Sequence, residues 1–262
     1  MRHLIRVPGW LLAAIAMATA VVAGVTAANA ETTLEAIKKK GTMVAGSSAE
    51  YPPFEYVADG KLVGYDIEMA DEIARRMGGV KVEWEKIDFK GIVAALTAKR
   101  VDVLITALTY TPERAARIAF SEPYFDAGIG ALIPKDSTVQ KADDLAGKKV
   151  GVQLGSSGER YVRETLGAKV GQLLTYDSIV LAINDLRNGR VEAVVNPLPV
   201  LRYAVRNDAG FRQTEVWDSR VVGINTRLED KELMAEINKH LVALKQEGFL
   251  AKLEAKWFGP GK

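Results

Sequence analysis

The sequence contains no cysteine and only two histidines among its 262 residues. Without cysteine the chain can form no disulfide and carry no lipid on a cysteine, so its core alone must stabilise the fold. His3 lies at the N-terminus and His240 lies in a helical pattern near the C-terminus. A Ser-His-Asp hydrolase or a histidine-rich metal site would depend on His240 alone, and a single helical histidine is more often structural. We therefore expect no catalytic histidine, no metal and no cofactor.

Charge gives no support for a nucleic-acid or anionic-membrane partner. The chain has 35 basic and 33 acidic residues, and two of the arginines lie within residues 1–30. Without that segment the basic and acidic residues balance, so the net positive charge that favours such partners is absent. The remainder is long enough for one large domain or for two smaller ones.

The first thirty residues have the layout of a secretory signal peptide. Arg2 and Arg6 give a positive start, residues 11–26 are almost entirely apolar, and the Ala-Asn-Ala at 28–30 is a small-x-small cleavage site. A membrane anchor is the weaker alternative, because the apolar run is short for a span of about 20 residues and a processing site follows it. We expect cleavage after Ala30 and a free periplasmic protein.

After residue 30, short strand-like runs alternate with helical patterns, which predicts an α/β fold. The first series has strands at 43–46, 80–87 and 101–107 and helices at 66–77 and 90–99. The second has strands at 150–152, 173–175 and 193–195 and helices at 159–166, 178–188 and 198–205. Two further helices are expected at 231–247 and 250–257. Two series in tandem predict two lobes rather than a single barrel.

Two local features concern how these segments begin and connect. Asp66 is the expected N-cap of the helix at 66–77, because aspartate accepts hydrogen bonds from the free N–H groups of a first helical turn. The extended stretches at 128–133 and 221–224 flank the second series. We therefore expect them to be the two linkers between the lobes.

Eight phrases, in their order and spacing behind an export signal, carry a family resemblance. They are YPPFE at 51–55, GYDI at 64–67, VDV at 101–103, TYTPER at 109–114, FSEPY at 120–124, GKKVGVQ at 147–153 with GS at 155–156, GRVEAV at 189–194 and WFG at 257–259. The sequence resembles the bacterial extracellular solute-binding proteins, family 3, which are the polar amino-acid-binding proteins of ABC importers. The resemblance runs through essentially the whole chain after the signal.

This resemblance implies a type II periplasmic-binding-protein fold, in which two α/β lobes are joined by two hinge strands. It places the first lobe at 31–127 and 220–262 and the second at 128–219. The ligand, an amino acid or a related small carboxylate, would lie between the lobes and be buried when they close. The protein would be a monomer that delivers this ligand to an ABC permease in the inner membrane, with no chemistry of its own.

Arg114 is the first candidate for the ligand contact. A guanidinium presents a fork of donors that matches a carboxylate, and by resemblance this arginine binds the α-carboxylate of the ligand. The plainer interpretation is a surface arginine paired with Glu113 or Glu122. Thr109 and Ala107 end the preceding strand, at the edge where open α/β sheets bind ligands. By resemblance, Thr109 offers its hydroxyl and backbone, and Ala107 offers a carbonyl to an ammonium.

Ser156 and Ser157 precede the helix expected at 159–166, where free N–H groups and the helix dipole favour an anion. By resemblance, Ser157 binds the second side of the carboxylate. The alternative is simple N-capping, which a serine can perform at the same time. A phosphate loop is a weaker alternative, because the segment lacks the Gly-Lys-Ser/Thr ending.

Three further positions match those that contact the side chain of the ligand in the family. Tyr51 and Phe89 fall where relatives place aromatic rings, although core packing is what most aromatic residues do. Ser48 falls where several relatives carry an aspartate for a cationic or amide side chain. A serine here, in place of that aspartate, argues against a strongly lysine- or arginine-selective site.

The sequence departs from the family at the amine side of the site. Relatives usually have an aspartate that pairs with the α-ammonium, at the position that is Pro197 here. Asn196, the preceding residue, could accept one hydrogen bond through its amide oxygen but carries no charge. The identity of the ligand is therefore open at this point.

Two other functions remain as alternatives. Some relatives of this fold are periplasmic dehydratases that act on prephenate-like acids and need a carboxylic acid in the cleft. Glu50 is the nearest acidic candidate for that role. The other alternative is a ligand-sensing receptor that reports to a separate signalling protein.

Overall fold

The computed structural model describes residues 31–259. The expected signal peptide and its cleavage site, and residues 260–262 of the expected C-terminal return, lie outside the described residues. From Thr32 onward the chain forms one compact unit. No helix within the described range is both long and apolar enough to cross a membrane.

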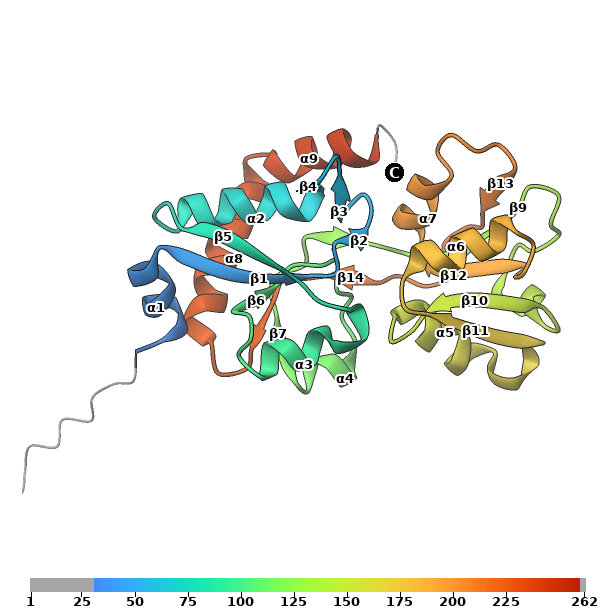
Figure 1. The fold of residues 1–262 in the computed structure, drawn as a ribbon, viewed down its shortest axis with the longest axis horizontal. Coiled ribbons are helices and arrows are strands. Elements are labelled where there is room, and N and C mark those ends of the chain that lie inside the picture. Colours follow the sequence, from blue (N-terminus) through green and yellow to red (C-terminus); the bar gives the residue numbers. More distant parts are fainter. Residues whose placement is uncertain (1–30, 260–262) are drawn as a thin grey trace, which may run out of the picture. The chain divides into compact units, whose positions relative to one another are not determined.

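The first sheet contains five strands in the order β5-β1-β6-β15-β7 (Figure 1). Strand β1 pairs in parallel with β5 and β6, and β15 pairs antiparallel with β6 and β7. Helix α2 packs against β5, α3 against β1, and α8 against β15. The bounds are α1 (Thr33–Lys40), β1 (Thr42–Ser47), α2 (Tyr65–Arg76), β5 (Lys81–Lys86), η1 (Phe89–Gly91), α3 (Ile92–Thr97), β6 (Val103–Leu104), α4 (Pro112–Ala115), β7 (Ile118–Phe120), β15 (Asn225–Arg227), α8 (Lys231–Gln246) and α9 (Phe249–Phe258).

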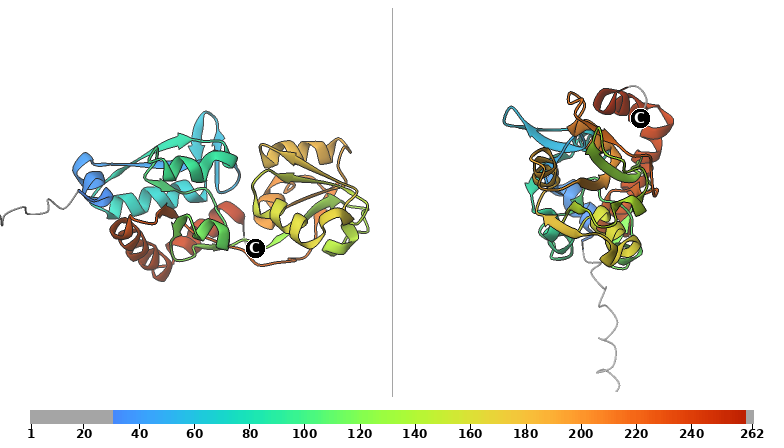
Figure 2. Two further views of the ribbon diagram at one scale, coloured as in Figure 1. Left: turned by 90° about the horizontal axis from the view of Figure 1, so that it is seen from below. Right: turned by 90° about the vertical axis from the view of Figure 1, so that its right-hand side faces the viewer.

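The second sheet also contains five strands, in the order β11-β10-β12-β9-β13, and Figure 2 shows both sheets from two further sides. Strand β10 pairs in parallel with β11 and β12, whereas β9 runs antiparallel to β12 and β13. Helix α5 packs on β12 and α6 on β10. The bounds are β9 (Ile129–Pro134), η2 (Ala142–Leu145), β10 (Lys149–Gln153), α5 (Ser157–Thr165), η3 (Gly167–Lys169), β11 (Gln172–Tyr176), α6 (Ile179–Arg187), β12 (Ala193–Pro197), α7 (Leu198–Ala204) and β13 (Phe211–Gln213).

Two short strands, β8 (Phe125–Asp126) and β14 (Val221–Val222), pair antiparallel and connect the two sheets. The expected two-lobed α/β architecture is thus confirmed. The prediction that 128–133 is a linker is wrong, because from Ile129 this stretch belongs to β9, a buried strand that lies between β12 and β13 in the second sheet. The other expected linker, 221–224, begins with β14.

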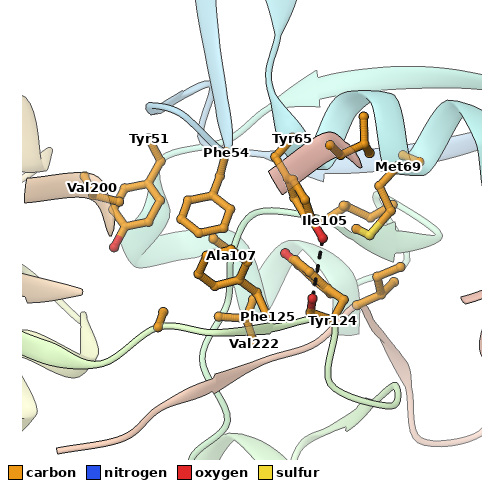
Figure 3. Packing of buried hydrophobic residues seen from close by; sticks show 14 of the residues in the cluster. Tyr51, Phe54, Tyr65, Met69, Ile105, Ala107, Tyr124, Phe125, Val200 and Val222 are labelled. Atoms are coloured by element: carbon orange, nitrogen blue, oxygen red, sulfur yellow. Dashed lines mark hydrogen bonds between the residues drawn. The ribbon is translucent and has the colours of Figure 1, made fainter. Parts of the chain in front are cut away.

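Aromatic packing joins three distant parts of the chain, and Figure 3 shows two of the rings, Phe54 and Phe125, close together. The ring of Phe54 is fully buried and lies 5.1 Å from the ring of Phe125 and 5.0 Å from that of Phe258, both in edge-on arrangements. Such pairs contribute about 0.5–1.5 kcal/mol beyond the area they bury. The connecting strand β8 and the last helix α9 are therefore fixed to the loop that follows Tyr51.

Helix α2 begins in a way that the sequence pattern did not indicate. Its N-cap is Gly64 rather than Asp66, and the loop backbone caps the helix, since Tyr65 N–H donates to Pro53 O and Asp66 N–H to Phe54 O. Gly64 has a φ of 142°, and a Cβ there would lie 2.1 Å from Phe54 O, so this position requires glycine. Because the backbone satisfies the first turn, the Asp66 side chain is available for another contact.

A small three-stranded sheet lies between the first strand and this helix. It consists of β2 (Glu50–Tyr51), β3 (Glu55–Ala58) and β4 (Lys61–Val63), in the order β2-β3-β4. Its turn residue Gly60 has a φ of 74°, as tight hairpins require. In this small sheet Tyr51 of β2 is the register partner of Glu55 of β3, so the two residues lie opposite each other on paired strands.

Candidate functional site

Arg114 joins the loop after β6 to the loop before α5. Its Nη1 donates to the carbonyl oxygen and to the hydroxyl of Thr109, at 2.8 and 2.9 Å, and its Nη2 donates to Gly155 O at 2.9 Å. Since a guanidinium has five N–H donors, these contacts leave the Nε donor and one Nη2 donor without an acceptor among the described residues. That free edge is one of the two that bind a carboxylate with paired hydrogen bonds.

Local capping explains where Arg114 points. The Thr111 hydroxyl caps the short helix α4 by accepting from the Arg114 N–H, and Pro112 occupies the first helical turn. The guanidinium carbon lies 5.7 Å from the centre of the Phe89 ring. Burial lowers the pKa of Arg114 to about 10, with a further contribution from the positive charge of Arg160, so the side chain stays protonated at neutral pH. The Phe89 ring thus lies within the range of a cation–π contact with this protonated guanidinium.

The N-terminus of α5 lies next to Arg114, because Gly155, which accepts a hydrogen bond from Arg114, directly precedes the N-cap of α5. Ser156 is the N-cap, and its hydroxyl accepts from Glu159 N–H at 3.1 Å, while Glu159 Oε2 accepts from Gly155 N–H at 2.6 Å. Ser157 is the first helical residue and is buried. A Cβ at Gly158 would lie 2.5 Å from Val195 O, so glycine lets α5 start directly against β12. The expected capping by Ser156 is confirmed, and the first-turn N–H groups lack intrahelical partners.

Tyr51 and Asn196 form a second contact between the lobes. Asn196 is fully buried and its Nδ2 donates to the Tyr51 hydroxyl at 2.8 Å, while its Oδ1 has no hydrogen-bond partner in the described part of the chain. Burial raises the pKa of Tyr51 above its ordinary value, so the phenol stays protonated. The hydroxyl accepts from Asn196 and keeps its own proton to donate. This pair thus leaves the Asn196 Oδ1 as an unused acceptor and the Tyr51 proton and the second Nδ2 hydrogen of Asn196 as unused donors.

Ser48 and Ala107, which we expected at the ligand side chain and the ammonium, are engaged by buried acids. The Ser48 hydroxyl donates to Glu55 Oε1 at 3.2 Å, and the Thr106 hydroxyl donates to the same oxygen at 2.5 Å. The Ala107 N–H donates to Asp66 Oδ2 at 2.7 Å, and Ala107 has a left-handed φ of 46°. These bonds fix the backbone that follows β1 and β6, where the candidate ligand contacts lie.

Glu55 and Asp66 are the residues that sequence reasoning missed. Both carboxyls are fully buried, and Glu55 Oε2 and Asp66 Oδ1 have no hydrogen-bond partner among residues 31–259. Burial, together with the nearby Asp66 carboxyl, holds the pKa of Glu55 well above its ordinary value, and burial raises the pKa of Asp66 to about 7. The available signal was position, since each residue lies within one of the quoted family phrases, YPPFE and GYDI.

Glu50, the acid considered for a catalytic role, lies elsewhere. Its carboxylate pairs with Lys86 Nζ at 2.6 Å, and its side chain is 43% exposed. Other contacts around the candidate site join the lobes, namely the ion pairs of Lys90 with Asp177 and of Glu113 with Arg160 and the hydrogen bond between the Tyr56 and Tyr203 hydroxyls. The structure therefore gathers Arg114, Thr109, Phe89 and the serines of α5 in one group and Tyr51 with Asn196 in another.

Comparisons with known proteins identify the family of this chain. The family model of the bacterial extracellular solute-binding proteins, family 3, matches residues 43–260. The L-cystine-binding protein TcyJ of Escherichia coli (strain K12) is 35% identical over 250 residues, which cover 93% of this chain and 93% of that protein.

Solved structures give the same result. An ancestral arginine-binding protein bound to arginine has a TM-score of 0.79 at 38% identity, covering 84% of this chain and 99% of that one. The ancestral amino-acid-binding protein AncCDT-1, described as a precursor of cyclohexadienyl dehydratase, has a TM-score of 0.82 at 33% identity, covering 87% and 100% of the two chains. Together with the two-lobed fold and with Arg114, which contacts both lobes, these matches show that the chain belongs to the bacterial extracellular solute-binding proteins, family 3.

Proposed function

We propose that this chain is the periplasmic substrate-binding component of an ABC importer, and that it binds an amino acid or a closely related small carboxylate between its two lobes. The observation that carries this proposal is Arg114, which contacts the first lobe at Thr109 and the second at Gly155 while keeping a free donor edge. A carboxylate bound to that edge would also reach the N-terminus of α5 at Ser157. Binding would then stabilise the contact between the lobes.

The relatives support the class of ligand but differ in its detail. One relative is named for cystine and one solved structure holds arginine, and both ligands carry an α-carboxylate and an α-ammonium. The carboxylate contacts proposed here require only the first of these groups. The side chain of the ligand would contact Tyr51 and Phe89. Ser48 is occupied by Glu55 and offers no charge to a cationic side chain.

The amine side of the site is where this chain differs from a plain α-amino-acid receptor. Pro197 offers neither a charge nor an N–H, and the acceptor beside it is the neutral Oδ1 of Asn196, which is buried without a partner. A buried ammonium without a counter-charge costs several kcal/mol. Glu50 does not supply that charge in this structure, since it pairs with Lys86. We therefore propose that the preferred ligand is a carboxylate whose nitrogen is uncharged, acylated or absent.

A thermal-shift panel tests this preference. Each amino acid is compared with its N-acetyl and its amine-free analogue, and a ligand at a hundred times its dissociation constant raises the free energy of unfolding by about 2.7 kcal/mol. We expect the larger shifts from the analogues. In the matched variant Asn196→Asp, which restores a carboxylate next to position 197, the preference should move toward the free amino acids. Large shifts from free amino acids alone in the unmodified protein would contradict the proposal.

We also propose that binding occurs without turnover. The proteins named in the comparisons above are binding proteins, and one of them is a precursor of a dehydratase. A dehydratase would need an acid at the substrate, whereas Glu50 is half-exposed and paired with Lys86. The compounds recovered from the thermal-shift samples should be unchanged in mass.

Export and lobe boundaries complete the proposal. The family is extracellular, and we propose that export removes residues 1–30 by cleavage after Ala30, leaving a periplasmic monomer. We propose that the first lobe comprises 31–127 and 220–262 and the second 128–219. The support for these bounds is strand membership, since β9 to β13 lie in the second sheet and β15 returns to the first.

A further inference from the structure

A cavity of about 490 Å³ lies away from the arginine site, between α7 of the second lobe and α9 of the first. The connecting strand β8 forms its third wall through Phe125 and Asp126. Figure 1 shows α7 and the end of α9 near each other, next to the label of the C-terminus. The volume falls within the range of about 300–1,000 Å³ that is typical of small-molecule sites. An occupant of this cavity would contact both lobes and the strand that connects them.

The walls of the cavity are aromatic and positively charged. Tyr203, Trp257 and Phe258 supply aromatic surface, and Arg202, Arg206 and Lys256 supply cations. Asp126, the acid of the lining, accepts a hydrogen bond from the Ser219 hydroxyl at 2.9 Å. Flat aromatic faces and guanidinium groups together favour a ligand with a ring and a negative charge.

Of the three cations in the lining, Arg202 and Arg206 keep their charge available to a ligand, whereas Lys256 does not. Lys256 pairs with Glu68 at 2.5 Å, so its charge is already matched. Arg206 stacks on the Tyr203 ring with its guanidinium carbon 3.8 Å from the ring centre, and its Nη1 donates to Tyr203 O. Neither Arg202 nor Arg206 has a carboxylate partner within residues 31–259. The local balance of charge is therefore positive.

The indole of Trp257 supplies a reporter group within the lining. Trp257 lines the cavity, and its indole N–H is buried without an acceptor among the described residues. We propose that this cavity is a second ligand site, separate from the arginine site, and that it takes a small aromatic carboxylate. The carboxylate contacts Arg202 and Arg206 and the ring packs on the aromatic wall.

The test uses 2-naphthoate as the probe and the indole N–H resonance of Trp257 as the readout, assigned with Trp257→Phe. We expect a saturable shift of that resonance with 2-naphthoate and none with 2-naphthylmethylamine, which has the same ring and the opposite charge. Arg202→Glu should weaken the binding at least tenfold. The matched control is Lys252→Glu, which makes the same change of charge but lies on α9 outside the cavity lining. This variant should bind 2-naphthoate as the wild type does.

The result separates this site from the principal one. In Arg114→Ala the Trp257 shift should persist with unchanged affinity. Loss of 2-naphthoate binding in Arg114→Ala, or equal affinity in Arg202→Glu and Lys252→Glu, would overturn the proposal, as would the absence of any Trp257 shift. Arg202 is exposed, and circular dichroism checks that the variant folds. Arg206→Gln provides a second variant with the same expected loss.

Discussion

Replacing Arg114 by alanine is expected to weaken ligand binding by tens- to thousands-fold while the fold remains intact. Removing one partner of a charge-assisted contact with a buried carboxylate costs about 2–5 kcal/mol, and each 1.4 kcal/mol is a factor of ten in affinity. The substitution also removes the hydrogen bonds to Thr109 and Gly155, so the lobes lose a contact that does not depend on ligand. Calorimetric titration of wild type and variant with the best ligand of the thermal-shift panel measures the loss.

Two companion variants make this result specific. Arg117→Ala removes an exposed arginine three residues away and should leave the affinity unchanged. Arg114→Lys keeps the charge but loses the fork of donors, so it should recover only part of the binding. Unchanged affinity in Arg114→Ala, for a ligand that needs its carboxylate, would mean that another residue binds that group.

The second large effect is a loss of stability as the pH rises from about 4.5 to 7. Asp66 has a pKa of about 7 in the folded protein, against 3.8 for the unperturbed group, and burial also raises that of Glu55. The folded state therefore binds protons more tightly than the unfolded chain, and the free energy of unfolding must fall with pH across this window. Each group contributes up to about 1.4 kcal/mol per unit of pH.

Substitution of Glu55 isolates this contribution. In Glu55→Gln the amide oxygen still accepts from Ser48 and Thr106, but the group no longer titrates. The stability of the variant relative to wild type should therefore increase with pH above 4.5, by up to about 1.4 kcal/mol per unit. The exposed Glu83→Gln controls for the loss of one carboxylate.

Urea denaturation at a series of pH values provides the measurement. Carboxylates whose pKa is lowered, such as Glu72 beside Arg75, lose their contribution to stability at more acid pH and do not interfere in this window. A wild type whose stability is flat between pH 4.5 and 7, or a Glu55→Gln variant that keeps the wild-type slope, would show that these carboxyls do not hold their protons.

Periodicity in the sequence predicted most of the elements correctly. The expected helix at 231–247 is α8 (Lys231–Gln246), and the expected strand at 173–175 lies within β11 (Gln172–Tyr176). Apolar spacing determines which face of these elements is buried, and that information is local. The alternation of strands and helices then gave the two-lobed α/β class.

The errors concern features that depend on distant backbone. The apolar stretch at 128–133 has the same local pattern in a linker as in a buried strand, and pairing with β12 decided which it is. The expected strand at 101–107 contributes only Val103–Leu104 to the sheet. Further along, Ala107 adopts a left-handed φ with its N–H bound to Asp66. No local pattern indicates that contact.

The candidate site likewise combines a feature that the local sequence predicted with features that depend on tertiary packing. The phrase around Arg114 predicted a carboxylate-binding arginine, and the structure places it against Thr109, Phe89 and Gly155, although its role with a ligand stays a prediction. The positions of Glu55 and Asp66 within the family phrases were a signal, but their burial was not predicted, because an acidic residue is most often solvated. Their burial follows from tertiary packing alone.

Native mass spectrometry of the protein recovered from its host's periplasm is the sharpest test of ligand binding by this chain. We expect a chain that begins at Glu31 and carries one small molecule, and that molecule, released by unfolding, should be a carboxylate without a charged amine. Its loss from Arg114→Ala, prepared in the same way, would place it in the site described here. A chain that carries no small molecule even after incubation with carboxylates, or one that keeps residues 1–30 and remains in the membrane, would contradict the account.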